Sequence, residues 1–157
     1  MPFVVAAEGD AVVLPDPEAT VEAVLRLVRH GRRPIGVGAG ALVKGPGPAR
    51  GPAALAAASA LAVAVRRPAR LAVRGAQPDE ALDAQAVLTA LAALVARRSA
   101  AAWTVVDLLA AGRTRSSVAA ELGVSRQAVG QRLAAGGWDL EGELRPTAAR
   151  LLARAAR

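Results

Sequence analysis

The sequence of 157 residues contains no cysteine, no tyrosine and no asparagine, and its single histidine is His30. Without thiols the chain forms no disulfide and offers no thiolate chemistry. One histidine without cysteine does not supply the ligand set of a zinc site. We therefore expect no metal site, and we also expect no cofactor and no catalytic residues, so that the protein is not an enzyme.

Long apolar runs and a basic N-terminal leader are missing as well. The longest apolar run, residues 53–65, is dominated by alanine and is shorter than the roughly 20 residues of a membrane-spanning helix. Glu8 and Asp10 are acidic, whereas a signal peptide begins with basic residues. We expect a cytoplasmic protein without a membrane partner.

Basic residues exceed acidic ones, with 20 Lys+Arg against 13 Asp+Glu and a formal net charge of +7. All but one of the basic residues are arginine, Lys44 being the exception. Arginine donates paired hydrogen bonds to phosphate and to guanine, so this balance favours a polyanionic partner. A genome rich in G and C also enriches arginine and alanine, and composition alone therefore leaves the partner open.

The first 75 residues alternate between strand and helix patterns. β-branched runs on either side of Gly9 predict a β-hairpin. Asp16 as a capping residue and Pro17 as the first helical residue predict that a helix begins there. Two further strands and a second helix follow, over residues 34–43, 70–74 and 52–65. The order β-β-α-β-α-β predicts an α+β fold in which helices cover a small sheet whose last strands run parallel.

Three glycines occupy alternate positions in the strand predicted over residues 34–43. Gly36, Gly38 and Gly40 share one face of that strand and leave it bare, so a helix or a ligand can approach the backbone there. The sequence GVGAG lacks the third glycine of a dinucleotide-binding fingerprint and does not open a helix directly. A helix and another kind of ligand both remain open as occupants of this face.

Residues 113–135, RTRSSVAAELGVSRQAVGQRLAA, combine two short amphipathic helices with a turn. Gly123 can take the positive φ of the turn, and the hydroxyl of Ser125 can cap the second helix. The apolar side chains of both helices form a shared core: Val118, Leu122, Val124, Val129 and Leu133. The stretch VAAELGVSRQAVGQRL resembles the helix-turn-helix of bacterial transcription regulators, as found in MarR-like regulators and in region four of sigma factors.

This resemblance implies a regulator that binds double-stranded DNA on the nucleoid, with residues 125–135 as the recognition helix in the major groove. Nine residues are candidates for contacts with bases or phosphates: Arg113, Arg115, Ser116, Ser117, Ser125, Arg126, Gln127, Gln131 and Arg132. Arg126, Gln127, Gln131 and Arg132 point away from the shared core and are the candidate sequence readers. One short helix-turn-helix makes few contacts with DNA, so we expect a homodimer that binds two half-sites.

Helical patterns surround this motif. A segment with apolar residues at helical spacing ends at Arg97 and Arg98, and we expect it to connect two units or to form a dimer contact. Residues 101–112 are predicted to form a helix that packs before the helix-turn-helix and completes a three-helix DNA-binding unit. We expect Trp103 to anchor the core of this unit rather than to stack on DNA bases. After residue 137 we expect a wing or a loop, and then a last helix that begins at Pro146.

The first half resembles class III nucleotide cyclase domains and SatD-like proteins. The resemblance is carried by Gly9 and Asp10 in the hairpin, by the GVGAG strand and by an alanine-rich helix after Gly51. In cyclases the hairpin aspartate is one of two carboxylates that hold metal ions on a nucleoside triphosphate. The strand that carries the other carboxylate has no counterpart before Phe3. We therefore expect a shortened, non-catalytic relative used for dimerisation or ligand sensing, with Asp10 as a turn residue.

The patterns divide the chain into three parts. We predict an α/β domain over residues 1–75, a connecting helix over 76–99 and a DNA-binding domain with a C-terminal helix over 100–157. Two other functions stay open: a nucleotide-binding sensor or degenerate cyclase-like domain, and a protein that contacts RNA polymerase through the helix-turn-helix. The first of these would include a small-molecule or nucleotide effector.

Overall fold

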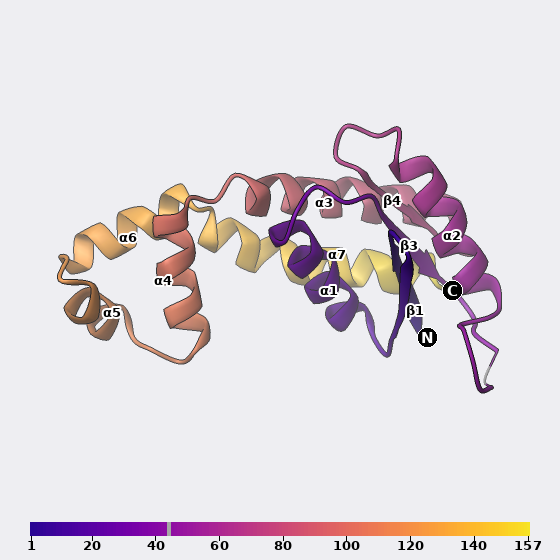
Figure 1. Ribbon diagram of the computed structural model, residues 1–157, viewed down its shortest axis with the longest axis horizontal. Helices are drawn as coiled ribbons and strands as arrows, with labels where there is room; N and C mark the ends of the chain where they lie inside the picture. Colours follow the sequence, from indigo (N-terminus) through magenta and orange to yellow (C-terminus); the bar gives the residue numbers. More distant parts are fainter. Residues whose placement is uncertain (44) are drawn as a thin grey trace.

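The computed structural model describes residues 1–43 and 45–157 and shows an elongated molecule (Figure 1). One end, which we call the body, is a sheet covered by helices, and the other end, which we call the head, is a small helical unit. Within the described residues the chain forms four strands and seven helices. The first six elements follow the predicted order β-β-α-β-α-β, and the predicted α+β fold is confirmed.

The sheet is mixed and has the strand order β2-β1-β3-β4. β1 (Phe3–Ala7) pairs antiparallel with β2 (Asp10–Leu14) through a turn in which Gly9 has φ +81°. β1 also pairs antiparallel with β3 (Ile35–Ala39), and β3 pairs parallel with β4 (Leu71–Arg74). The predicted hairpin and the predicted parallel pairing of the last strands are both confirmed.

α2 (Pro52–Ala64) joins β3 to β4 and lies on one face of the sheet, over Gly36 and Gly38. A Cβ at Gly38 would overlap the carbonyl oxygen of Ala53, and a Cβ at Gly36 would overlap the backbone of Leu61. The two glycines therefore allow the helix backbone to lie unusually close to the strand. Of the two occupants left open by the sequence for this face, it is a helix that fills it.

Three helices cover the opposite face of the sheet: α1 (Pro17–Arg29), α3 (Pro78–Ala96) and α7 (Trp138–Ala155). α3 and α7 lie side by side and run in opposite directions along the length of the molecule (Figure 1). The core between these helices and the sheet is built from aliphatic and aromatic side chains, among them Phe3, Val24, Leu25, Val37, Leu71, Leu88, Leu91 and Leu152. Burial of these side chains is the main term that stabilises the body.

The course of α7 differs from the sequence prediction. The expected wing or loop over residues 138–145 and the expected helix start at Pro146 are wrong, because one helix runs from Trp138 to Ala155. Proline lacks the amide that would donate to the carbonyl of Gly142, which weakens a helix interior. The helix continues because both of its halves are buried against the rest of the chain, through Glu141 before the proline and Ala148 after it.

The packing of α7 also bears on the predicted division of the chain. Its second half belongs to the core of the body, although the sequence grouped it with the DNA-binding unit. α3, predicted as a connecting or dimerising helix, buries Leu88, Leu91 and Val95 in the same core and leaves Leu82 exposed. The head is thus inserted between two antiparallel helices of the body. In the described residues no single helix is long and apolar enough to cross a membrane, although α3 and α4, which are separated by a bend of 110°, would together reach that length and composition.

Candidate nucleic-acid interface

The head consists of α4 (Ala100–Ala110), α5 (Arg115–Leu122) and α6 (Arg126–Ala135). Its core contains small and aliphatic side chains from all three helices: Val105, Val106, Val118, Ala119, Val129 and Leu133. Leu122 and Val124 are half-buried at the margin of this core. The shared core that the sequence predicted for α5 and α6 is confirmed.

Gly123 and Ser125 shape the turn between α5 and α6. Gly123 has φ +64°, in the left-handed region that favours glycine. The Oγ of Ser125 accepts a hydrogen bond from the backbone N–H of Ala128 at 3.0 Å and so caps α6, as predicted. α5 has a similar cap that the sequence analysis missed, in which the Oγ1 of Thr114 accepts from the N–H of Ser117 at 3.1 Å. A threonine directly before a helical pattern was the available signal.

The predicted sequence readers lie on the outer face of α6. Arg126, Gln127 and Gln131 are exposed, and Arg132 is half-buried. Neither arginine makes an ion pair with any described residue, so both guanidinium groups are free to meet an anion. Gly130 lies between these side chains, and apart from its chain neighbours and the adjacent turns of its own helix backbone, no described atom lies within 4 Å of the position that a Cβ there would take. Packing within the chain therefore does not require glycine at this position.

The remaining predicted contact residues differ in their surroundings. Arg115 and Ser116 are exposed in the first turn of α5. Arg113 is engaged within the head, because its Nε donates to the Oγ of Ser117 at 3.1 Å and its Nη2 pairs with Glu121 at 2.6 Å. The side chains of this ion pair are 44% and 42% exposed, and such a pair contributes only about 0.2–1 kcal/mol. A phosphate could therefore replace Glu121 as the partner of Arg113 at small cost.

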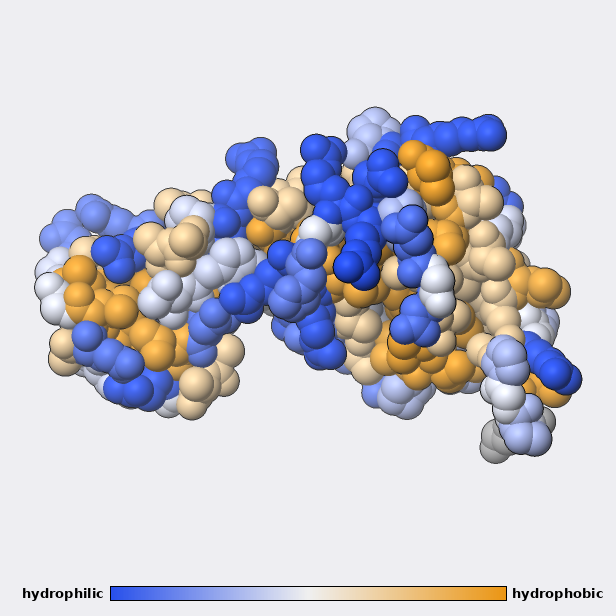
Figure 2. All heavy atoms as spheres, in the orientation of Figure 1, coloured by the Kyte–Doolittle hydropathy of each residue, from blue (hydrophilic) through white to orange (hydrophobic). Residues whose placement is uncertain are grey.

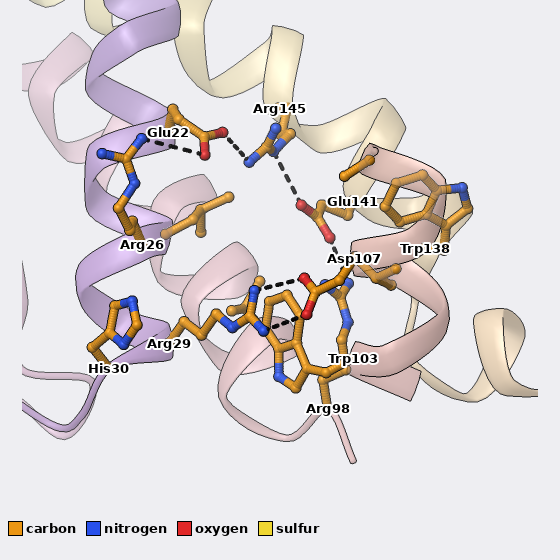
Figure 3. A pocket seen from close by; sticks show the side chains of 14 residues that line it. Glu22, Arg26, Arg29, His30, Arg98, Trp103, Asp107, Trp138, Glu141 and Arg145 are labelled. Atoms are coloured by element: carbon orange, nitrogen blue, oxygen red, sulfur yellow. Dashed lines mark hydrogen bonds and ion pairs between the residues drawn. The ribbon is translucent and has the colours of Figure 1, made fainter. Parts of the chain in front are cut away.

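Trp103 of α4 anchors the head to the body (Figure 3). Its ring packs against the cores of both units, so its predicted role as a core anchor is confirmed and extended. The guanidinium carbon of Arg29 lies 3.8 Å from the ring centroid, and that of Arg98 lies 4.6 Å from it. These are distances at which a cation is attracted to the π electrons of an indole.

An ion pair joins α1 to α4 beside this ring. Arg29 donates two parallel hydrogen bonds to Asp107, from Nη1 to Oδ1 at 2.8 Å and from Nη2 to Oδ2 at 2.7 Å. The hydrogen bond from Arg29 lowers the pKa of the Asp107 carboxyl and raises the pKa of the Arg29 guanidinium, so the pair stays charged at neutral pH. The two residues lie 78 positions apart, and no sequence pattern connected them.

A second ion pair, between Arg98 and Glu141, is buried (Figure 3). The Nη2 of Arg98 donates to the Oε2 of Glu141, and its Nε donates to the carbonyl oxygen of Gly136 at 3.0 Å. Arg145 extends the network to Glu22 of α1, at 2.6 Å. Because Arg98 follows α3 and Gly136 follows α6, these bonds tie together the two chain segments that connect the head to the body.

The hairpin residue singled out by the cyclase resemblance has a local role. Asp10 is exposed at the start of β2, and its Oδ1 accepts a hydrogen bond from the N–H of Ala11 at 3.0 Å. Among the described residues, no three histidine, aspartate or glutamate side chains come together in a group that could hold a metal ion. The hydrogen bond of Asp10 is thus local to the hairpin, as expected for a turn residue.

Comparison with protein-family models, with curated proteins and with solved structures finds no match to this chain. The two resemblances thus rest on the residues that carry them in the sequence. For the head, these residues form two capped helices around a common core, with arginine and glutamine side chains on the outer face. For the hairpin, they form a turn in which Asp10 accepts a hydrogen bond from the N–H of Ala11.

Proposed function

We propose that the protein is a transcription regulator that binds double-stranded DNA through α6, placed in the major groove. The observation that carries this proposal is the outer face of α6, where Arg126, Gln127 and Gln131 project from a helix whose opposite face is buried. Arginine reads guanine and glutamine reads adenine through paired hydrogen bonds to base edges. The helix before it, α5, is held by the turn at Gly123 and can cross the phosphate backbone.

Two further features of the head support the same function. Glycine in a helix interior costs about 1 kcal/mol relative to alanine, and Gly130 serves no packing within the described chain. A bare backbone beside the exposed Gln127 and Gln131 instead lets another molecule approach closely. The charge of the motif also favours DNA, since Arg113, Arg115, Arg126 and Arg132 stand against the single acid Glu121.

A homodimer is part of this proposal. Four side chains on one recognition helix give little discrimination among DNA sites, whereas two half-sites multiply it. The edge strand β2 offers a surface for a second copy, because Val12 and Val13 are 52% and 47% exposed on its two faces. An edge strand presents unpaired N–H and C=O groups, and the same strand of a second copy can complete them around a two-fold axis.

Selection of bound fragments from a bacterial genomic library tests DNA binding directly, and fluorescence anisotropy then measures affinity for a recovered fragment. We expect binding that weakens as salt rises, because arginines displace counterions from phosphates. The double variant Arg126→Ala/Gln127→Ala should bind at least about 30-fold more weakly, since each of the two paired base contacts contributes about 1–3 kcal/mol and together they contribute at least about 2 kcal/mol.

The matched control removes one arginine and one glutamine from the exposed surface of the body, as Arg154→Ala/Gln77→Ala. This variant should bind like the unmodified protein. An equal loss in both variants would mean that overall charge, and not α6, determines binding. The absence of any salt-dependent shift would overturn the proposal, and co-purification with RNA polymerase in that case would favour the alternative of a polymerase-binding protein.

A further inference from the structure

A cavity lined by arginines lies on the body, close to the point where the head is attached. It has a volume of about 610 Å³ and is bounded by the ends of α1 and α3, the beginnings of β3 and β4, and Trp103. Figure 2 shows hydrophilic residues gathered where the head joins the body. Six arginines line the cavity: Arg29, Arg32, Arg33, Arg70, Arg97 and Arg98. No aspartate or glutamate of the described chain lines it.

The cavity has a surplus of positive charge. Asp107 neutralises Arg29 and Glu141 neutralises Arg98, but the other four arginines form no ion pair within the described residues. The carboxyl ends of α1 and α3 oppose this charge, and each contributes about half a negative charge. Four unpaired guanidinium groups less about one unit from the helix ends leave roughly three positive charges. Like charges held in one concavity repel each other, so this arrangement favours an anion as occupant.

Two of the lining arginines have buried donors without an acceptor. The Nη1 of Arg98 and the Nε of Arg70 are withdrawn from water and have no hydrogen-bond partner among the described atoms. The Arg98 side chain is 0% exposed, and an unsatisfied buried donor costs about 1–3 kcal/mol. Arg70 also has φ +53°, a left-handed conformation that is rare outside glycine and that clusters at binding sites. Both residues line the cavity, so the unsatisfied donors and the left-handed backbone lie in its wall.

We propose that this cavity binds a compact phosphate-bearing anion, of the size of pyrophosphate or tripolyphosphate. Guanidinium groups match phosphate oxygens in pairs, and charge-assisted hydrogen bonds of this kind are about twice as strong as neutral ones. Arg32, Arg33, Arg70 and Arg97 line the cavity without an ion-pair partner among the described residues and supply the free charges. Several charges on the ligand are needed to balance them, which excludes a singly charged anion as a good fit.

The position of the cavity connects it to the head. Arg29 and Arg98 line the cavity, and the same two side chains flank Trp103 and hold Asp107 and Glu141. An anion that draws either guanidinium toward itself changes the contacts that fix α4 to α1 and α3 to α7. Ligand binding would in this way bias the orientation of α6. This coupling rests on the proposed DNA binding, whereas the anion site itself does not.

The fluorescence of Trp103 reports on the cavity, provided that the other tryptophan is replaced by Trp138→Phe. We expect a saturable change when pyrophosphate or tripolyphosphate is added, and the same dissociation constant from calorimetry on the unmodified full chain. The variant Arg33→Gln/Arg97→Gln, which removes two exposed lining arginines and leaves the buried pair intact, should weaken binding at least 10-fold. Arg66→Gln/Arg154→Gln removes the same charge outside the cavity and should leave binding within twofold.

Three outcomes would overturn the site. The first is an equal response to sodium sulfate at the same ionic strength, and the second is an equal loss in both variants, since each indicates general screening of positive charge. The third outcome is measured by titration with a 20-base-pair DNA duplex. Binding of duplex that depends on Arg33 and Arg97, without saturable binding of polyphosphate, would assign these arginines to the DNA backbone. The test of Arg126 and Gln127 is separate, so failure of either proposal can be recognised on its own.

Discussion

At the scale of single residues, Arg98 lies where the head joins the body and contacts residues of both. Its buried guanidinium donates to Glu141 and to the carbonyl oxygen of Gly136, and it lies against Trp103. A buried ion pair adds little stability relative to well-packed apolar side chains of the same size, because removing two charges from water is costly. Loss of only one partner is far worse, since the other charge then stays buried without compensation.

Glu141→Leu should therefore lower the free energy of unfolding by about 3–5 kcal/mol, because it leaves the charge of Arg98 buried. The double variant Arg98→Met/Glu141→Leu buries no charge and should lie much closer to the unmodified protein. Urea denaturation followed by circular dichroism measures both. Equal losses in the single and the double variant would show that packing at this position, and not the uncompensated charge, is what matters.

At the scale of elements, α7 contains a proline in its interior, where this residue is unfavourable. Pro146 lies inside the helix and is exposed, so its ring makes no contribution to the core. Pro146→Ala restores an N–H that can donate to the carbonyl of Gly142, and it removes the clash of the ring with that carbonyl. We expect the free energy of unfolding to rise by about 1–3 kcal/mol, measured by thermal and urea denaturation.

Gly142→Ala is a useful comparison for this variant. Apart from its chain neighbours and the adjacent backbone of its own helix, a Cβ at Gly142 would meet nothing within 4 Å among the described atoms, so the change should raise stability by about 1 kcal/mol through helix propensity alone. If Gly142→Ala stabilises the protein while Pro146→Ala destabilises it, the local geometry imposed by the proline is needed to seat α7 on the body.

The elements that were predicted correctly are those whose signals act within a few residues. Asp16 caps α1 through a hydrogen bond three residues ahead, Gly9 closes a hairpin turn, and Ser125 caps α6. The course of α7 was missed because proline is common in the first turn of a helix, which made Pro146 resemble a helix start. The helix instead continues through Pro146 because residues on both sides of the proline are buried by the fold. Such burial cannot be recognised from the neighbouring residues in the sequence.

The same distinction applies to the candidate sites. The core of the head and its caps lie within one stretch, so the sequence predicted nearly all of them. The pair of Arg29 and Asp107 joins residues 78 positions apart. The arginine-lined cavity is assembled from four separate parts of the chain, around residues 28–35, 68–70, 92–98 and 103. Only the fold brings them together, and an excess of arginine in the composition was the sole sign of them in the sequence.

At the scale of the whole molecule, β2 is the predicted contact between two copies. Val12→Lys should convert the dimer to a monomer, because a lysine on an edge strand blocks pairing with another strand. Light scattering coupled to gel filtration, at several protein concentrations, measures the change. Leu82→Lys, at an exposed position of α3, is the control and should leave the dimer intact. A monomeric unmodified protein, or dissociation by Leu82→Lys alone, would contradict an interface at β2.

The insertion of the head between α3 and α7 also determines when each part can fold during synthesis. The core of the body joins Phe3 to Leu152, so it closes only after the chain has been made as far as α7. The core of the head joins Val105 to Leu133 and can close earlier. Until α7 emerges from the ribosome, the apolar faces of α1 and α3 lack their cover, and such surfaces promote aggregation of nascent chains. A messenger RNA truncated before the codons of α7 would therefore yield a chain with a folded head and an incompletely folded body, whose exposed apolar surface promotes aggregation.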